Sequence, residues 1–129
     1  MTDQLLYRDE CCRLIGACLA VHPDKGNGFA DPVCQDALEI ELELSGIPFD
    51  AQRNYQIAYR GRPLKHTYTP DLLCFGQIIM ELKAVQTLTD EHRAQGLNYL
   101  KVTGLQLGLL VNFGSPSRLE WERIVLTHP

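Results

Sequence analysis

The sequence predicts an α/β fold, in which helices flank a mixed β-sheet in the order α-α-β-β-β-α-β-β. Three observations support this. Two N-terminal segments carry apolar residues at helical spacing, residues 49–59 alternate as a half-buried strand does, and residues 107–113 form the nearly continuous apolar run of a fully buried strand. A strand, a helix and that buried strand in succession predict a right-handed parallel crossover. We expect a single domain over residues 1–129.

The two N-terminal helices have defined expected ends. The first is expected over residues 3–21 and stops at His22-Pro23, because a residue before proline is pushed out of the helical conformation. The second is expected to begin with Asp31 as N-cap and Pro32 at the first helical position, and to end at Ser45 before a glycine. The predicted apolar faces are Leu5, Cys12, Ile15, Leu19, Leu14, Cys18 and Val21 in the first helix, and Val33, Ala37, Ile40 and Leu44 in the second.

The remaining elements follow from turn signals and apolar patterns. They are a strand from Phe49 to Tyr59, a turn at Arg60-Gly61-Arg62-Pro63, strands from Leu64 to Cys74 and from Gln77 to Ala84, a helix from its N-cap Thr89 to Gly104, and an edge strand from Leu119 to Leu126.

The stretch from Thr67 to Lys83 predicts a β-hairpin, because a short loop with Gly76 at its centre supplies the positive φ angle that a tight turn needs. The numbers of antiparallel partners then sum to 152, so Asp71 faces Glu81, and Lys83 points to the same side. Opposed carboxylates repel unless they share a cation, and oxygen ligands favour Mg²⁺ or Mn²⁺ over Zn²⁺. The alternative is that Asp71 only ends a strand and that Glu81 and Lys83 form an exposed charge pair.

Charge is distributed unevenly along the chain. The formal net charge is −4, from 12 basic and 16 acidic residues, which argues mildly against a polyanionic partner. Residues 51–70 nevertheless contain no acid, and their four cations alternate with tyrosines. Either this stretch tracks the phosphates of a nucleic acid, or it is only the polar face of exposed strands. The cations are Arg53, Arg60, Arg62 and Lys65, and the tyrosines are Tyr55, Tyr59 and Tyr68.

Other features of the composition exclude several classes of protein. No apolar run reaches the ~18 residues of a membrane-spanning helix, and no signal pattern is seen at the N-terminus, so we expect a cytoplasmic protein without a membrane partner. The 5 cysteines are odd in number and lack Cys-x-x-Cys spacing, which predicts neither a disulfide framework nor a zinc site.

Several short motifs occur in an order that resembles a known family. Pro70-Asp71 followed by Glu81-Leu82-Lys83 resembles the motif of the PD-(D/E)XK nuclease superfamily. The surrounding segments resemble, more narrowly, the small bacterial GxxExxY group within it. These segments are Leu14-Ile15-Gly16-Ala17, Val21-His22, Gly26-Asn27-Gly28, Glu81-Leu82-Lys83-Ala84-Val85, Gln95-Gly96-Leu97-Asn98-Tyr99-Leu100 and Gly108-Leu109-Leu110-Val111-Asn112-Phe113.

The resemblance implies a restriction-endonuclease-like fold and a metal-dependent nuclease that hydrolyses phosphodiester bonds, with DNA as the expected substrate. Asp71, Glu81 and the backbone carbonyl of Leu82 would hold Mg²⁺ or Mn²⁺, and Lys83 would position the attacking water. Gln95 and Tyr99 resemble the Gln-x-x-x-Tyr motif of RecB-like exonucleases, which implies contact with the substrate. An amphipathic helix also carries Gln and Tyr at the margin of a core, so a structural role stays open.

The sequence departs from the group in the helix before the sheet. Where the group has Gly-x-x-Glu-x-x-Tyr, residues 28–34 replace both the acid and the aromatic residue. Asp31 is therefore a candidate third metal ligand, with Glu41 as the other candidate, and capping of the helix alone would also explain Asp31. The alternative function is a nuclease-fold module with little or no catalysis that binds nucleic acid or a protein partner. A second copy of the chain also remains open as a partner.

Overall fold

The structure is a computed structural model, and it describes residues 6–25 and 28–127. Its elements, in chain order, are α1 (Arg8–Lys25), α2 (Asp31–Leu44), β1 (Phe49–Asp50), β2 (Tyr55–Tyr59), β3 (Arg62–Tyr68), β4 (Leu72–Cys74), β5 (Ile78–Lys83), α3 (Asp90–Thr103), β6 (Leu107–Asn112) and β7 (Glu120–Val125). Within the described ranges no helix is long and apolar enough to cross a bilayer.

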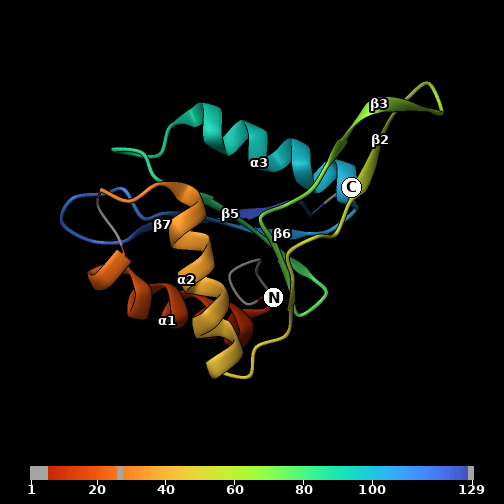
Figure 1. Cartoon of the computed structure of the whole chain (residues 1–129). Coiled ribbons are helices and arrows are strands. Elements are labelled where there is room, and N and C mark those ends of the chain that lie inside the picture. Colours follow the sequence, from red (N-terminus) through yellow and green to blue (C-terminus); the bar gives the residue numbers. More distant parts are fainter. Residues whose placement is uncertain (1–5, 26–27, 128–129) are drawn as a thin grey trace.

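Five strands form a mixed sheet in the order β1-β4-β5-β6-β7. The strands β5 and β6 are parallel and joined through α3, and the other neighbours are antiparallel. The helices α1 and α2 pack on one face and α3 on the other (Figure 1). This arrangement confirms the predicted mixed sheet, the parallel crossover and the edge strand near the C-terminus.

The alternation of side chains along β5 divides the interior into two layers. Ile78, Met80 and Leu82 point into the core shared with α1 and α2, whereas Ile79 points into the smaller core under α3. Because successive side chains point to opposite faces of a sheet, Glu81 and the lysine that follows two residues later share the α3 side of the sheet. The core therefore fixes the face on which the polar end of β5 lies.

The first helix differs from its prediction. It continues through Pro23 to Lys25. Proline lacks the N–H that would bond to the carbonyl four residues earlier, and the helix tolerates this loss here because Pro23 lies in its last turn. Leu14, Cys18 and Val21 are buried as predicted, but Cys12 and Leu19 are exposed. The expected start at residue 3 and the placement of Leu5 lie outside the described residues.

The second helix also differs. Its N-cap is Ala30, with an extended backbone and no side-chain cap, so Asp31 is the first helical residue and not the cap. The buried face is Cys34, Leu38 and Leu42, whereas Val33, Ile40 and Leu44 of the predicted face are exposed. Two apolar stripes lie side by side on this helix, and helical periodicity alone does not decide which one is buried. The predicted end is confirmed, with Ser45 as C-cap and Gly46 at φ +69°.

Two predicted strands are each divided in two. The strand expected from Phe49 to Tyr59 breaks after β1, where Asp50 Oδ1 accepts a hydrogen bond from Gln52 N at 2.8 Å and turns the chain. The strand expected from Leu64 to Cys74 breaks between β3 and β4, where Pro70 cannot donate a ladder hydrogen bond. In place of one continuous sheet, β2 and β3 form a separate antiparallel pair.

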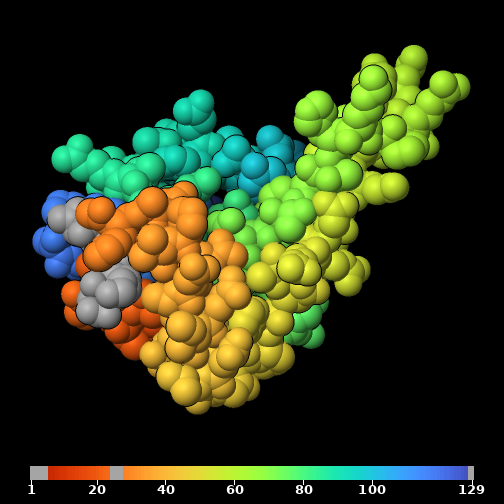
Figure 2. Space-filling view, in the orientation of Figure 1, coloured from red at the N-terminus to blue at the C-terminus, as the bar shows by residue number. Residues whose placement is uncertain are grey.

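We call β2, β3 and the turn between them the hairpin arm. The turn is only Arg60-Gly61, with φ angles of +53° and +76°, so β3 begins at Arg62, inside the four-residue turn that was predicted. Two consecutive positive φ angles are typical of a type I′ turn, whose twist suits a two-stranded hairpin. The arm projects away from the body of the molecule (Figures 1 and 2).

The hairpin of β4 and β5 has the predicted register. Leu72 pairs with Met80, and Cys74 pairs with Ile78, so partner numbers sum to 152 and the turn is centred on Gly76 at φ +67°. The third helix is likewise confirmed: Thr89 accepts a hydrogen bond from His92 N at its start, and Gly104 ends it at φ +76°.

The segment after β5 is packed directly on a glycine. Asn112 is fully buried, and its Oδ1 accepts hydrogen bonds from both Val85 N and Gly114 N at 2.9 Å. A Cβ atom at Gly114 would lie 2.5 Å from the Val85 carbonyl oxygen, closer than van der Waals contact allows. The chain that follows Lys83 is therefore held in place by a close approach of two backbones.

We predict that Gly114→Ala destabilises the fold by about 1–3 kcal/mol, because the two backbones must separate. Gly16→Ala is the matched control, because its Cβ meets nothing within 4 Å in the interior of α1 and should stabilise by ~0.5–1 kcal/mol. Chemical denaturation of the three proteins measures both effects. Equal stability of Gly114→Ala and the wild type would contradict the close packing.

Candidate active site

The two acids at the open end of the β4–β5 hairpin are held by each other's strands. Asp71 Oδ2 accepts a hydrogen bond from the Leu82 backbone N–H at 2.7 Å, and Glu81 Oε2 accepts one from the Asp71 N–H at 3.2 Å. Each carboxylate is thus fixed through one named oxygen. The geometry brings together the pair that the hairpin register predicts and contradicts the alternative of an exposed Glu81–Lys83 pair, since both acids are only partly accessible.

The surroundings of the two acids disfavour their charged forms. Burial, followed by the charge of Asp71, raises the pKa of Glu81 from its usual 4.5 to about 7. Burial also raises the pKa of Asp71, although the Leu82 N–H and the charge of Lys83 oppose this rise. Lys83 favours the ionised form of both acids, which agrees with its place on the same face of β5.

Tyr68 is a site residue whose role the sequence did not predict. Its hydroxyl donates a hydrogen bond to Glu81 Oε2 at 2.8 Å, and its ring stacks on Tyr99 at 3.9 Å between centroids. The pKa of Tyr68 is raised by burial and by Glu81, so the phenol remains a donor at neutral pH. The sequence signal was present only as one of three tyrosines among basic residues.

Gln35 is the second such residue, and it ties α2 to the site. Its Nε2 donates to the Asp71 backbone oxygen at 2.9 Å and to Glu39 Oε2 at 3.2 Å. Asp31 precedes Gln35 by four residues and therefore lies on the same side of the helix, and its charge contributes to raising the pKa of Asp71. No pattern in the sequence indicates this contact between α2 and the residue just before β4.

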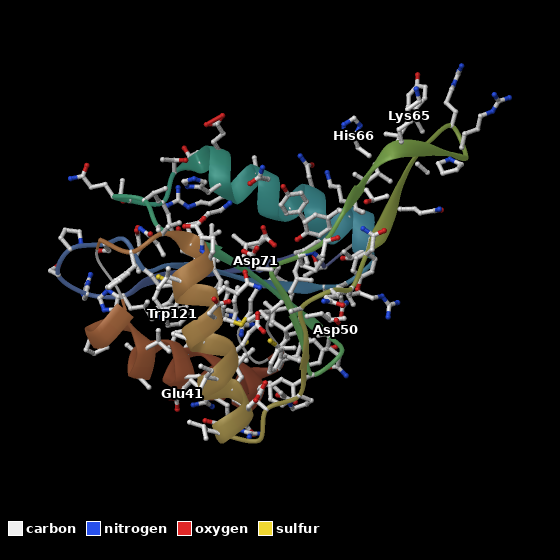
Figure 3. The ribbon with its side chains drawn as sticks, in the orientation of Figure 1. Glu41, Asp50, Lys65, His66, Asp71 and Trp121 are labelled. Carbon is white, nitrogen blue, oxygen red and sulfur yellow. The ribbon has the colours of Figure 1, made fainter. Side chains whose placement is uncertain are left out.

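The other predicted residues lie at different distances from the two acids. Glu41 follows Gln35 by six residues, about 9 Å further along α2 and on another side of it, and Figure 3 labels it toward the end of the helix away from Asp71. Tyr99 reaches the site through its stacking on Tyr68, and the charges of both acids contribute to raising its pKa. Gln95 is exposed one turn earlier on α3.

The four predicted basic residues are exposed in or next to the hairpin arm. They are Arg53, Arg60, Arg62 and Lys65.

The two acids suit a hard cation but do not enclose one. Among the described residues, no group of three or more His, Cys, Asp or Glu side chains is placed to hold a metal ion. Two carboxylates, each anchored by one oxygen, leave a second oxygen for a cation, and Mg²⁺ commonly binds through one or two carboxylates while it keeps several waters. Burial raises the pKa of both acids, and a bound divalent ion would offset this cost by stabilising their charged forms, so the donor set fits such an ion.

A cleft of about 790 Å³ opens beside the site, between the start of α2 and the chain that follows β5. Its lining includes Asp31, Ala84 and Gln86, but neither Asp71 nor Glu81. Asp31 therefore lines the cleft and also acts electrostatically on Asp71. Its structural role is that of an acid in the first turn of α2, where the helix dipole favours negative charge.

The comparison with known protein families identifies the superfamily of the chain. The chain matches the family model of the PD-(D/E)XK nuclease superfamily over residues 8–124, and it belongs to that superfamily. The mixed five-stranded sheet flanked by helices is its restriction-endonuclease-like fold. No curated protein matches the chain.

Two solved structures resemble the chain. The crystal structure of SSO0001 has a TM-score of 0.61 at 19% identity, and the match covers 98% of this chain and 63% of that one. This chain thus spans less than two thirds of SSO0001, and the likeness shows the fold alone. An alkaline exonuclease from Laribacter hongkongensis has a TM-score of 0.44 at 14% identity, covering 97% of this chain and 72% of the exonuclease.

We predict that the metal-free protein loses stability as the pH rises from about 4.5 to 7. The pKa of Glu81 is raised on folding, so the folded state binds more protons in that window, and up to about 3 kcal/mol of stability present at low pH is lost. Asp71 and Lys83 border this carboxyl on the strands, Tyr68 donates to it, and Tyr99 lies behind Tyr68. Denaturant titrations in chelator across this range measure the change.

Glu81→Gln is the control, because an amide cannot titrate and this contribution to the pH dependence should disappear. A variant with the same pH dependence as the wild type would mean that Glu81 ionises at its ordinary pKa.

Proposed function

We propose that the protein is a nuclease that hydrolyses phosphodiester bonds in DNA with Mg²⁺ or Mn²⁺. The observation that carries this proposal is the pair Asp71 and Glu81, two partly buried acids that the fold forces together although their charges repel. A fold that only needed stability gains little from such a pair, because opposed like charges in a ladder are destabilising. Membership of a nuclease superfamily supports the same conclusion.

Asp71, Glu81 and the Leu82 carbonyl would hold the cation, with Asp31 as the candidate for a further ligand. When bound, a divalent cation supplies positive charge to the phosphate and eases deprotonation of the attacking water. Lys83 brings a second positive charge to the same face, where it orients the water and offsets the charge that develops on the phosphate. Gln95 and Tyr99 would steady the substrate strand beside α3.

The surrounding residues position this set. Tyr68 holds one oxygen of Glu81 through its hydroxyl, and Gln35 holds the backbone of Asp71 from α2. Because these partners come from two separate elements, β3 and α2, the two acids are held in one arrangement before substrate binds. Catalysis of this kind depends on such prior placement of charged groups.

The alternative is a nuclease-fold module that binds nucleic acid with little or no catalysis. Two observations favour it: among the described residues no group of three or more His, Cys, Asp or Glu side chains is placed to hold a metal ion, and residues 28–34 of the helix region before the sheet carry an altered motif. The alternative predicts binding without cleavage, and the same assay therefore separates the two functions.

The test is cleavage of labelled DNA with Mg²⁺ or Mn²⁺, with Ca²⁺ and chelator as negative conditions. We expect Asp71→Asn, Glu81→Gln and Lys83→Ala each to lose at least about 10²-fold in rate while remaining folded. Arg118→Gln, an exposed residue in the loop before β7, is the control that should keep full activity. Undiminished cleavage by all three site variants would identify a contaminating nuclease and end the proposal.

The same assay with Asp31→Asn decides the role of Asp31. Asp31 is the first helical residue and not the cap, so Asn loses only the interaction of its charge with the helix dipole, about 0.3–1 kcal/mol. A loss of activity in a variant that stays folded would support a ligand role. Full activity would remove Asp31 from the site.

A further inference from the structure

The hairpin arm is attached to the body at its base. Tyr68, the last residue of β3, stacks on Tyr99 of α3, and the pair Tyr55–Tyr68 closes the base of the ribbon. Asn54 Nδ2 donates to Thr67 Oγ1 and Thr69 Oγ1, both at 2.8 Å, which reinforces the same base. Beyond it, every residue from Ala58 to Thr67 is exposed, and Figure 2 shows the ribbon standing clear of the rest of the surface.

The arm carries positive charge that no acid among the described residues pairs with. Three cations of the arm, Arg60, Arg62 and Lys65, and Arg53 just before it, form no ion pair with any residue that the structure describes. Residues 51–70 contain no acid. The whole chain has a net charge of −4, so the arm is a local exception on an acidic protein. Unpaired cations on an exposed ribbon match the phosphates of a nucleic acid.

The length of the arm sets how far it reaches. Its base residue Tyr68 donates to Glu81, and β3 runs seven residues from there to Arg62 at the tip. At ~3.4 Å per residue, the tip lies about 20 Å from the acid pair. Because a B-form duplex rises ~3.4 Å per base pair along its axis, a tip about 20 Å away would reach the duplex roughly six base pairs from the reacting phosphate if the arm lies along the axis.

We propose that the hairpin arm binds B-form duplex DNA beside the bond that is cut, with its tip in the major groove. This deepens the proposed function and rests on it, because it names the class of substrate. A two-stranded ribbon fits the ~12 Å major groove of B-DNA, whereas the major groove of duplex RNA is deep and narrow.

The aromatic residues argue against single-stranded DNA. Proteins that bind single strands offer exposed rings on which successive bases stack. Here Tyr68 is buried, and Tyr55 and Tyr99 are half-buried against it, which leaves Tyr59, 67% exposed, as the accessible tyrosine of this group. The arm therefore offers cations for a backbone and too few free rings for a row of unpaired bases.

The experiment measures binding in chelator, so that it does not depend on cleavage. The probes are fluorescent 16-base-pair DNA duplex, the same single strand, and duplex RNA of the same sequence, each titrated over a range of salt concentrations. The test variant is Arg60→Asn with Arg62→Gln, because Asn tolerates the positive φ angle of Arg60. Arg8→Gln with Arg118→Gln removes the same charge from two exposed sites outside the arm.

We expect the arm variant to raise the Kd for duplex DNA by at least about tenfold near 0.1 M salt, and to reduce the slope of log K against log salt by roughly 1.8, which is two phosphate contacts. The control variant should bind as the wild type does. We also expect duplex DNA to bind more tightly than either other probe.

Unchanged duplex binding by the arm variant would overturn the proposal, and so would equal or tighter binding of single-stranded DNA or duplex RNA. Failure of cleavage with arm-dependent binding intact would refute only the nuclease activity. Cleavage with arm-independent binding would refute only the role of the arm.

Discussion

The reciprocal hydrogen bonds between Asp71 and the Glu81–Leu82 backbone are the constraint on which the site depends. The Leu82 N–H donates to the Asp71 carboxylate and the Asp71 N–H donates to the Glu81 carboxylate, so each acid continues the ladder where the regular β4–β5 pairing ends. These bonds satisfy buried backbone donors, and they also hold two like charges together. The result is a site that is formed in advance, in which the two acids are only partly compensated by Lys83.

The rest of the molecule supports this pair from several directions. The register of the hairpin comes from its turn, the rotation of β5 comes from the two hydrophobic layers, and α2 and β3 each contribute one side-chain hydrogen bond through Gln35 and Tyr68. Tyr68 serves two parts of the molecule at once, since it fixes Glu81 and ends the strand that forms the arm. The side chain of Tyr68 therefore connects the proposed DNA-binding arm directly to the acid pair.

Local patterns in the sequence predicted the turns and helix ends that depend on neighbouring residues. The turn at Gly76 fixed the opposition of Asp71 and Glu81, and the capping residue Thr89 fixed the start of α3. The misses have long-range causes. The contact from Gln35 joins residues 36 positions apart, and no period in the chain signals it. The hairpin arm was not predicted, because the alternation of side chains continues through the two points where the expected strands are interrupted. These interruptions depend on Asp50 and on the proline before β4.

The most direct test of the central claim, that Asp71 and Glu81 share one cation, is calorimetric titration of the metal-free protein with Mn²⁺. We expect one ion per chain for the wild type and a loss of at least about tenfold in affinity for Asp71→Asn and for Glu81→Gln, because each removes one of two charged ligands. Arg118→Gln should bind as the wild type does. Wild-type affinity in the Asp71→Asn, Glu81→Gln double variant would contradict the account.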